Sequence, residues 1–420
     1  MKKPKNKKKK KKRRSFSLPP KRKQKRRHIW LKVLPEDLWL KVRRGKTILE
    51  ALQKTDILVE GDCGGIGKCG KCKVKVLSSL GPPSMEGKEL LEDEEIRQGV
   101  RLACRTNLKK DLTIQVGDPG EEVTYYQILK VGRRPIFQLD PLLDKKLVTL
   151  NSEGENNGLA DFEKIKLVMG PEYHDLAAPL DCLRTLPEML SRTEFRGAVV
   201  VHDKTMLAWQ PWEEGGCRYG LVFDLGTSTL VGKLVSLLDG KEIAAISRLN
   251  SQSKFGANVI SRLQYIKENR QGLRSLNELL IRDLNLISKR LFEVGELSPE
   301  DVFIGVAAGN TTMQHLLLSL NPTGIAQAPF NPVSRDGMIS KAAELGLQFH
   351  PEALLYVMPA RSGYIGGDLI SAVIASGAAE QDDLMVLGMD LGTNGEIFLG
   401  NRKRLLTCSA AAGPALEGAK

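Results

Sequence analysis

Apolar and polar residues alternate along the first part of the chain as they do in half-buried strands. His28–Leu34 and Leu38–Val42 have the two-residue period of a strand, so a hairpin is expected there. Thr47 and Glu50 have the spacing of a capping box, which predicts that a short helix begins at this point. The same patterns predict a helix and a turn in Glu86–Gln98 and strands at Cys72–Leu77 and Leu112–Val116.

The pattern changes at Gly117–Gly120, where turn-forming residues gather, so a domain boundary is expected there. Residues 119–158 are weakly patterned and are interpreted as a linker. Residues 159–215 have the pattern of a small α/β middle domain. Its expected elements are helices at Phe162–Met169 and Leu183–Leu190 and a buried strand at Gly197–Asp203. His174 and His202 have no cysteine or carboxylate cluster at ligand spacing, so both are interpreted as structural or exposed.

An apolar strand that runs into an Asp-x-Gly-Thr turn occurs twice in residues 216–420. The first copy is Tyr219–Thr229, and the second is Val386–Gly395, 166 residues further on. Each copy precedes a further strand pair, and Asp239-Gly240 is a strong hairpin signal within the first. Two copies indicate a duplicated fold, whereas one alone could be an ordinary turn.

The segment between the two copies alternates helical and strand patterns. Its expected helices are Gly256–Asn269, Leu276–Phe292, one that begins near Thr311, and Asp368–Ala375, and its expected strands are Asp301–Ala307 and Leu354–Met358. The helix Asp368–Ala375 is expected to link the two halves of the duplicated fold.

Four cysteines have the spacing of an iron-sulfur site. Cys63, Cys69 and Cys72 form a C-x5-C-x2-C motif in a glycine-rich loop, and Cys104 follows at a distance. The glycines permit positive φ and a close backbone approach, so several N–H groups can point at sulfur. This arrangement favours electron transfer.

Three other readings of these cysteines remain open from the residues alone. A structural zinc site usually uses two close ligand pairs, and Cys104 has no cysteine or histidine near it in the sequence. A disulfide needs an oxidising compartment, which neither a signal peptide nor the odd cysteine count supports. Buried structural thiols do not need a glycine-rich loop. The isolated Cys182, Cys217 and Cys408 are interpreted as reduced thiols of a cytoplasmic protein.

The two Asp-x-Gly-Thr turns have the residues of a phosphate site. Backbone N–H groups and hydroxyls would face phosphate oxygens, and the aspartates would lie near Mg²⁺ or its waters. The candidate nucleotide-binding residues are Asp224, Gly226, Thr227, Ser228, Thr229, Asp390, Gly392, Thr393 and Asn394.

Most of the formal charge of +13 lies in the first 27 residues, which hold 17 Lys or Arg and no acid. The other 393 residues carry 46 basic and 50 acidic side chains. Residues 1–27 have too few large apolar side chains to fold, so a disordered basic tail is expected that can bind anions without sequence specificity. The chain has no run of 18 apolar residues, so no membrane span is expected.

The element order and the cysteines of residues 28–118 resemble a β-grasp ferredoxin domain of the C-x5-C-x2-C kind. Residues 216–420 resemble the sugar-kinase, actin and heat-shock chaperone (ASKHA) superfamily, in which two halves clamp ATP. The resemblance implies an α+β and α/β multidomain protein whose ATPase domain is incomplete at its C-terminus. The order of domains as a whole is similar to the reductive activators of corrinoid-dependent enzymes, which return Co(II) corrinoid proteins to Co(I) using ATP.

This resemblance implies a 2Fe-2S cluster on Cys63, Cys69, Cys72 and Cys104, and ATP with Mg²⁺ in a full-length form. The implied partners are a corrinoid protein or corrinoid-dependent methyltransferase and an electron donor such as a ferredoxin or reductase. Two alternatives are a kinase-like ATPase with a redox-sensing ferredoxin module and a simple electron carrier.

Two features depart from the family pattern. Asn258 stands where the pattern has an aspartate, which leaves a role in Mg²⁺ binding there open. The chain stops at Lys420, where the family continues through its adenosine site, so a truncated chain is expected.

Overall fold

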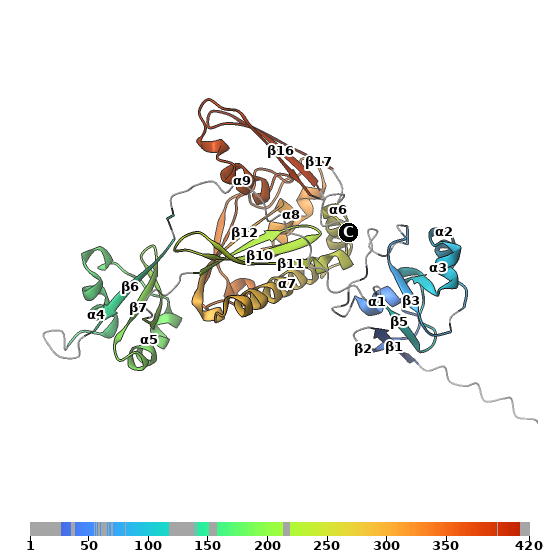
Figure 1. The fold of residues 1–420 in the computed structure, drawn as a ribbon, viewed down its shortest axis with the longest axis horizontal. Coiled ribbons are helices and arrows are strands. Elements are labelled where there is room, and N and C mark those ends of the chain that lie inside the picture. Colours follow the sequence, from blue (N-terminus) through green and yellow to red (C-terminus); the bar gives the residue numbers. More distant parts are fainter. Residues whose placement is uncertain are drawn as a thin grey trace, which may run out of the picture.

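The computed structural model describes residues 27–34, 38–53, 55, 57, 59, 65, 67–68, 70–79, 81–116, 139–140, 142–150, 158–212, 219–392 and 394–411. These residues form three lobes, with a central domain between an N-terminal domain and a middle domain (Figure 1). The basic tail up to residue 26, Cys63, Cys69, Thr393 and most of the predicted linker lie outside the described residues.

A five-stranded mixed sheet in the order β2-β1-β5-β3-β4 forms the N-terminal domain. Its elements are β1 (His28–Leu34), β2 (Leu38–Arg43), α1 (Ile48–Leu52), β3 (Lys73–Val76), α2 (Met85–Leu90), α3 (Asp93–Arg97), β4 (Val100–Leu102), η1 (Ala103–Arg105) and β5 (Leu112–Gln115). β1 pairs antiparallel with β2 and parallel with β5, so the predicted hairpin is confirmed. The capping box is confirmed too, because Glu50 N donates to Thr47 Oγ1 at 3.1 Å and Thr47 N donates to the Glu50 carboxylate at 2.7 Å.

The middle domain begins earlier in the chain than the sequence predicts. Its antiparallel sheet has the order β6-β7-β8, and β6 (Leu143–Thr149) lies inside the predicted linker. The remaining elements are α4 (Asp161–Met169), η2 (Pro171–Tyr173), α5 (Leu180–Arg192), β7 (Arg196–His202) and β8 (Thr205–Pro211). β6 is an edge strand in which only Leu143 and Val148 are buried, so its polar centre hides the strand pattern.

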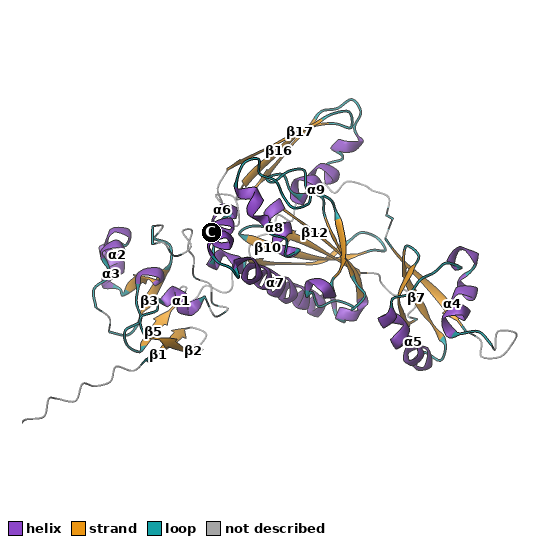
Figure 2. Ribbon diagram, turned by 180° about the vertical axis from the view of Figure 1, so that it is seen from behind, coloured by secondary structure: helices purple, strands orange, loops and turns teal. Residues whose placement is uncertain are grey.

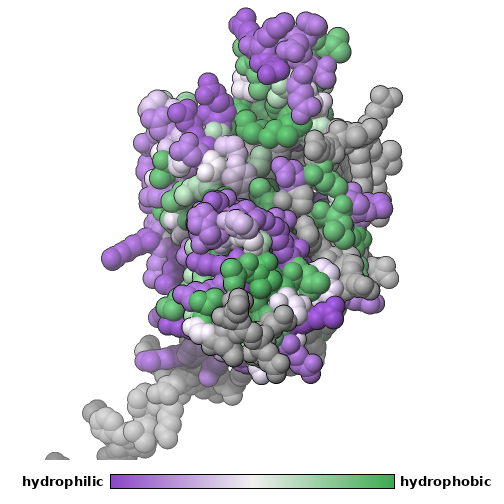
Figure 3. Space-filling view, turned by 90° about the vertical axis from the view of Figure 1, so that its left-hand side faces the viewer, coloured by the Kyte–Doolittle hydropathy of each residue, from purple (hydrophilic) through white to green (hydrophobic). Residues whose placement is uncertain are grey.

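His174 and His202 of this domain each bond a backbone carbonyl through Nδ1, at 2.8 Å to Pro171 O and 2.9 Å to Leu142 O, so their structural interpretation is confirmed. Figure 3 views the molecule from the side of this lobe, where apolar side chains interrupt a mostly hydrophilic face. Leu147, Leu167 and Val168 are among the exposed apolar residues of the domain. Single exposed apolar side chains are normal for folded proteins.

A six-stranded sheet in the order β11-β10-β9-β12-β14-β13 forms most of the central domain. Its elements are β9 (Tyr219–Leu225), β10 (Thr229–Ser236), β11 (Glu242–Leu249), η3 (Ser251–Lys254), α6 (Val259–Glu268), α7 (Gly272–Gly295), η4 (Pro299–Asp301), β12 (Val302–Gly309), α8 (Thr311–Leu317), η5 (Pro322–Ala326), β13 (Met338–Lys341), η6 (Ala343–Leu345) and β14 (Leu354–Val357). The long helix α7 runs along the sheet (Figure 2) and buries Leu276, Leu280, Leu284 and Leu291 against it. This stripe has the helical period that the sequence predicts.

A second meander repeats the first one. β15 (Val386–Leu391), β16 (Asn394–Gly400) and β17 (Leu405–Ala411) pair antiparallel in that order, as β9, β10 and β11 do. The predicted duplication is therefore confirmed for these strands. Helix α9 (Gly367–Ala375), followed by η7 (Ala378–Glu380), contacts β12 of the large sheet and β15 and β16 of the small one. This position confirms that α9 links the two halves.

The central domain contacts both other lobes. A buried apolar cluster, which includes Leu143, Val200, Leu207, Phe303 and Ile304, joins it to the middle domain. Hydrogen bonds between Gln53 and Lys254 and between Lys254 and Thr55 join it to the N-terminal domain. Among the described residues, no helix combines the length and the apolar character that crossing a membrane needs.

Candidate functional site

Two of the four predicted cysteine ligands lie within the described residues, and they are neighbours. Cys72 directly precedes β3, and Cys104 lies in η1 directly after β4, the strand that pairs with β3. Their sulfur atoms are 3.2 Å apart, and both side chains are buried. A covalent S–S bond is about 2.05 Å long, so these are two free thiols close enough to bind one metal centre. Cys63 and Cys69 lie outside the described residues.

The surroundings of Cys72 favour its thiolate form. The hydrogen bond with the Cys104 thiol lowers the pKa of Cys72 from 9.0 to about 6, although burial acts in the opposite direction. Backbone N–H groups of Cys104, Cys72 and Ala103 lower this pKa further. Because the thiolate is the form that binds metal, the donor set fits a cluster ligand.

The loop before Cys72 requires glycine at three described positions. The φ angle is +93° at Gly65, +79° at Gly67 and +72° at Gly70, in the left-handed region that side chains disfavour. A Cβ on Gly67 would also overlap the guanidinium group of Arg105, the residue after Cys104. The predicted need for positive φ is confirmed at these glycines.

The first phosphate turn joins β9 to β10 and is tightly closed. A Cβ on Gly226 would overlap the backbone oxygen of Thr229. Thr227 is buried, and its hydroxyl oxygen accepts a hydrogen bond from Asn310 Nδ2 at 3.0 Å. Asp224 lies near the end of β9 with an exposed side chain. The candidate residues from Asp224 to Thr229 therefore lie together in one hairpin.

Two buried side chains that were not predicted hold this turn from below. Asn250 Nδ2 donates to Gly226 O at 2.9 Å, and the backbone N–H of Asn250 donates to Ser228 O at 2.8 Å. Arg262, which is fully buried, donates to Thr227 O and to Gln252 Oε1. Its position in an amphipathic helix pattern does not distinguish a buried arginine from an exposed one.

Asn258, which departs from the family pattern, caps helix α6. Its Oδ1 accepts a hydrogen bond from Ser261 N at 2.9 Å. Asparagine is among the preferred N-cap residues. The side chain thus has a local structural role.

The second turn lies beside a group of carboxylates. β15 and β16 place Asp390 directly opposite Glu396, and Asp368 lies in the first turn of α9. Burial, together with the charges of Asp368 and Asp390, raises the pKa of Glu396 from 4.5 to about 8. Burial, together with the charge of Asp390, raises the pKa of Asp368 from 3.8 to about 6. A cation would relieve this repulsion. Gly392 lies in the turn and Asn394 begins β16.

Helix α9 connects the carboxylates with the first turn. A Cβ on Gly366, the N-cap of α9, would overlap the Gly309 carbonyl oxygen and crowd Asn310, the residue that bonds Thr227. In the part of the chain that the structure describes, no three His, Cys, Asp or Glu side chains could hold a metal ion together. A Mg²⁺ ion at this site would therefore take most of its ligands from water and phosphate, as Mg²⁺ usually does.

Comparisons with known proteins follow the same division of the chain. Residues 32–109 match the 2Fe-2S iron-sulfur cluster binding domain, residues 219–381 the RACo middle region, and residues 384–420 the C-terminal ASKHA domain of RACo. The corrinoid activation enzyme RamQ of Eubacterium limosum is 30% identical over 380 residues, which are 85% of this chain and 56% of RamQ. The chain belongs to the RACo family.

Structural comparison agrees with this membership. The solved structure of a reductive activator for corrinoid, iron-sulfur protein matches with a TM-score of 0.62 and 30% identity, over 93% of this chain and 64% of that one. The chain thus spans about half the length of RamQ and less than two thirds of the solved RACo-family chain. One component of the Na⁺-translocating NADH-quinone reductase of Chlamydia trachomatis serovar D is 32% identical over 87 residues, 20% of each chain.

The RACo family assignment confirms two predictions and clarifies one name. The N-terminal domain is a 2Fe-2S cluster binding domain, and the second meander belongs to an ASKHA domain. The RACo middle region corresponds to β9 through η7 of the central domain, whereas the middle domain defined above lies before it in the chain.

Replacing Gly226 with alanine is expected to distort the first turn. The new Cβ would displace the Thr229 backbone, and such overpacking costs about 1–3 kcal/mol of unfolding free energy. Urea denaturation measures this loss. Gly158→Ala is the matched control, since a Cβ there meets nothing within 4 Å, and its stability should stay unchanged. Equal stability of the two variants would contradict the tight turn.

Proposed function

We propose that this chain provides ATP-dependent reductive activation of corrinoid proteins. One electron passes from the reduced 2Fe-2S centre to Co(II), which becomes Co(I), while the centre returns to its oxidised state. The observation that carries the proposal is that one chain holds a free thiol pair in a 2Fe-2S domain and two phosphate-type hairpins joined by α9. RamQ, a relative along 85% of the chain, is named for corrinoid activation.

In this proposal Cys63, Cys69, Cys72 and Cys104 hold the 2Fe-2S cluster. When bound, the cluster supplies a centre that takes up and releases one electron. The low pKa of Cys72 keeps its sulfur available as a thiolate ligand, and burial of Cys72 and Cys104 keeps water away from this side of the site. The glycine backbone at Gly65, Gly67 and Gly70 leaves space for close approach of the loop to the cluster.

The two hairpins hold ATP and Mg²⁺ in this proposal. Backbone N–H groups of the turns at Gly226 and Gly392, with the hydroxyls beside them, face phosphate oxygens. Asp224 and Asp390 lie near the ion or its waters. Protonated Glu396 and Asp368 lose protons when the cation arrives, because a positive charge stabilises their carboxylate forms.

The reason for coupling to ATP is energetic. Reducing Co(II) is uphill from an ordinary donor, and about 59 mV of unfavourable potential reduces a one-electron equilibrium constant tenfold. Nucleotide binding between the halves shifts the population toward a state in which the electron transfer is easier. The proposed partners are a corrinoid protein or methyltransferase, and a ferredoxin or reductase as donor. The chain's free thiols Cys182 and Cys408 fit the reducing cytoplasm, and the basic tail offers nonspecific anion binding.

The test combines the protein, a reduced donor and a Co(II) corrinoid protein under anaerobic conditions. Co(I) absorbance is expected to rise only when ATP and Mg²⁺ are present. ATP turnover that needs no corrinoid protein would support the kinase-like alternative. A reducible cluster without ATP binding in calorimetry would support the simple carrier, and either result would contradict the proposal. A version that extends to the length of RamQ is tested in parallel.

A further inference from the structure

We propose that Lys254 is a positioning residue that docks the 2Fe-2S domain onto the central domain and ties this docking to the first phosphate turn. The consequence for electron transfer rests on the proposed function. The docking itself does not, and it can be tested without nucleotide or corrinoid.

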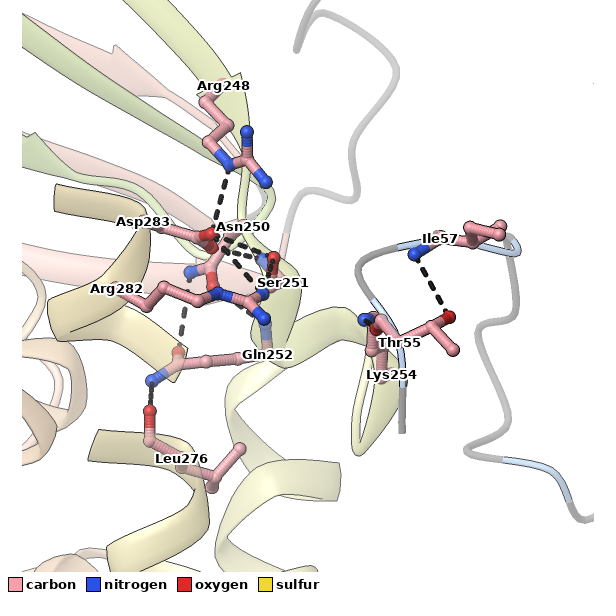
Figure 4. A network of polar contacts seen from close by, with 10 residues as sticks. All are labelled: Thr55, Ile57, Arg248, Asn250, Ser251, Gln252, Lys254, Leu276, Arg282 and Asp283. Atoms are coloured by element: carbon pink, nitrogen blue, oxygen red, sulfur yellow. Dashed lines mark hydrogen bonds and ion pairs between the residues drawn. The ribbon is translucent and has the colours of Figure 1, made fainter. Parts of the chain in front are cut away.

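The contact that carries the inference is a buried lysine that crosses between two domains. Lys254 ends η3 of the central domain, and its ammonium group donates to the carbonyl oxygen of Thr55 in the N-terminal domain (Figure 4). In return, Gln53 Nε2 donates to the backbone oxygen of Lys254 at 3.0 Å. Only 5% of Lys254 is exposed. A buried ammonium group is costly unless it is hydrogen-bonded, so the side chain favours one docked geometry.

On the N-terminal side, Thr55 is joined to the core that holds the cysteines. Its backbone N–H and its hydroxyl both donate to Leu52 O, at 2.9 and 2.7 Å, and its Oγ1 accepts from Ile57 N at 3.2 Å. Leu52 and Ile57 belong to the same buried cluster as Cys72 and Cys104. A force on Thr55 therefore acts on the packed core of the 2Fe-2S domain and not on a free loop.

On the central side, η3 is held by a buried polar network. Ser251 donates to the carboxylate of Asp283 from its backbone N at 2.8 Å and from its hydroxyl at 2.9 Å. Asp283 is fully buried in α7 and also accepts from Arg248 Nε at 2.9 Å (Figure 4). Gln252 Nε2 donates to Leu276 O at 2.9 Å. These bonds fix η3 to the long helix of the central domain.

The first residue of this network reaches the phosphate turn. Asn250, the N-cap of η3, donates to Gly226 O and Ser228 O. Only η3 separates Asn250 from Lys254, so one short rigid element contacts both the turn and the docked domain. A ligand that shifts the turn shifts Lys254 as well, and thermodynamic linkage requires docking to affect ligand binding by the same factor.

Hydrogen exchange of the full chain with its cluster tests the docking. In Lys254→Met the amides of Thr55 and Ile57 are expected to exchange about tenfold faster or more, because a charge-assisted hydrogen bond at the interface is lost. Lys233→Met is the matched control, since Lys233 pairs with Glu242 at 2.7 Å in β11 and does not bond the N-terminal domain. Unchanged exchange in Lys254→Met at unchanged melting temperature would overturn the docking.

A second variant tests the tie to the turn. Asn250→Ser keeps an N-cap hydroxyl but removes the amide that bonds Gly226, and it should speed exchange at Thr55, which Asn250 does not contact. The double variant with Lys254→Met should add no further increase. Independent, multiplying effects would overturn the tie while leaving the docking intact.

ATP with Mg²⁺ provides the third measurement. Calorimetry reports binding, and exchange at Thr55 should change on binding in the wild-type chain but not in Lys254→Met. If the wild-type chain binds ATP and Thr55 does not respond, the tie is overturned. If ATP does not bind at all, the proposed function fails, while the two variants above still decide the inference.

Discussion

Replacing Cys104 with serine is expected to leave the protein without its 2Fe-2S cluster. A neutral hydroxyl is a poor substitute for a thiolate, and Cys104 also lowers the pKa of Cys72 through the 3.2 Å contact between their sulfur atoms. The variant therefore loses one ligand and weakens a second. Visible absorbance, iron and acid-labile sulfide should all fall to background, and reductive activation should fall with them.

The stability of the N-terminal domain should decrease in the same variant, because cluster binding adds to the folding free energy. Cys408→Ser is the matched control, since Cys408 is an exposed free thiol in β17, and its iron and sulfide content should equal that of the wild type. Full iron and sulfide in Cys104→Ser would refute the four-cysteine assignment. Colourless wild-type protein that contains zinc would refute the cluster itself.

Replacing Glu396 with glutamine is expected to change how stability depends on pH. The folded-state pKa of Glu396 is raised from 4.5 to about 8, so the folded protein binds a proton more tightly than the unfolded chain does. This contribution is fully present below about pH 4.5 and is lost as pH rises through about 8. The shift corresponds to about 3–5 kcal/mol over that window. The wild-type chain should therefore lose stability from mildly acidic to mildly basic pH.

Glu396→Gln should remove most of this slope and be the more stable protein above about pH 8. Asp368 contributes a smaller loss in the same direction between pH 3.8 and about 6. Urea denaturation across this pH range measures both effects, and Glu293→Gln, an exposed change on α7, should keep the wild-type slope. Equal slopes in Glu396→Gln and the wild type would contradict the buried carboxylate cluster.

Mg²⁺ with ATP should flatten the wild-type slope as well, since a cation beside the carboxylates favours their charged forms. Proton release on ATP binding, measured by calorimetry in buffers of different ionisation enthalpy, checks this effect. It should be largest near pH 7 and much smaller in Glu396→Gln. Binding without proton release would place the cation away from Glu396.

Local patterns were sufficient wherever the interacting groups are near in sequence. The capping box at Thr47 and Glu50 formed as predicted, and the Asp239-Gly240 signal lies in the turn between β10 and β11, with φ of +68° at Gly240. The two Asp-x-Gly-Thr turns could be recognised because a turn needs only a few consecutive residues. The polar edge strand β6 was missed because only its pairing with β7 makes it a strand.

The sequence by itself determined the chemistry available to this protein: the thiol motif, the repeated phosphate turns and the helices between them, each set by neighbours along the chain. Only the tertiary structure decided how those parts act on one another. It buried Arg262 beneath a turn 35 residues away, raised the pKa of Glu396 beside Asp368, and joined Lys254 to Thr55 across 199 residues. Burial and charge proximity depend on distance in space, which the spacing of residues along the chain does not specify.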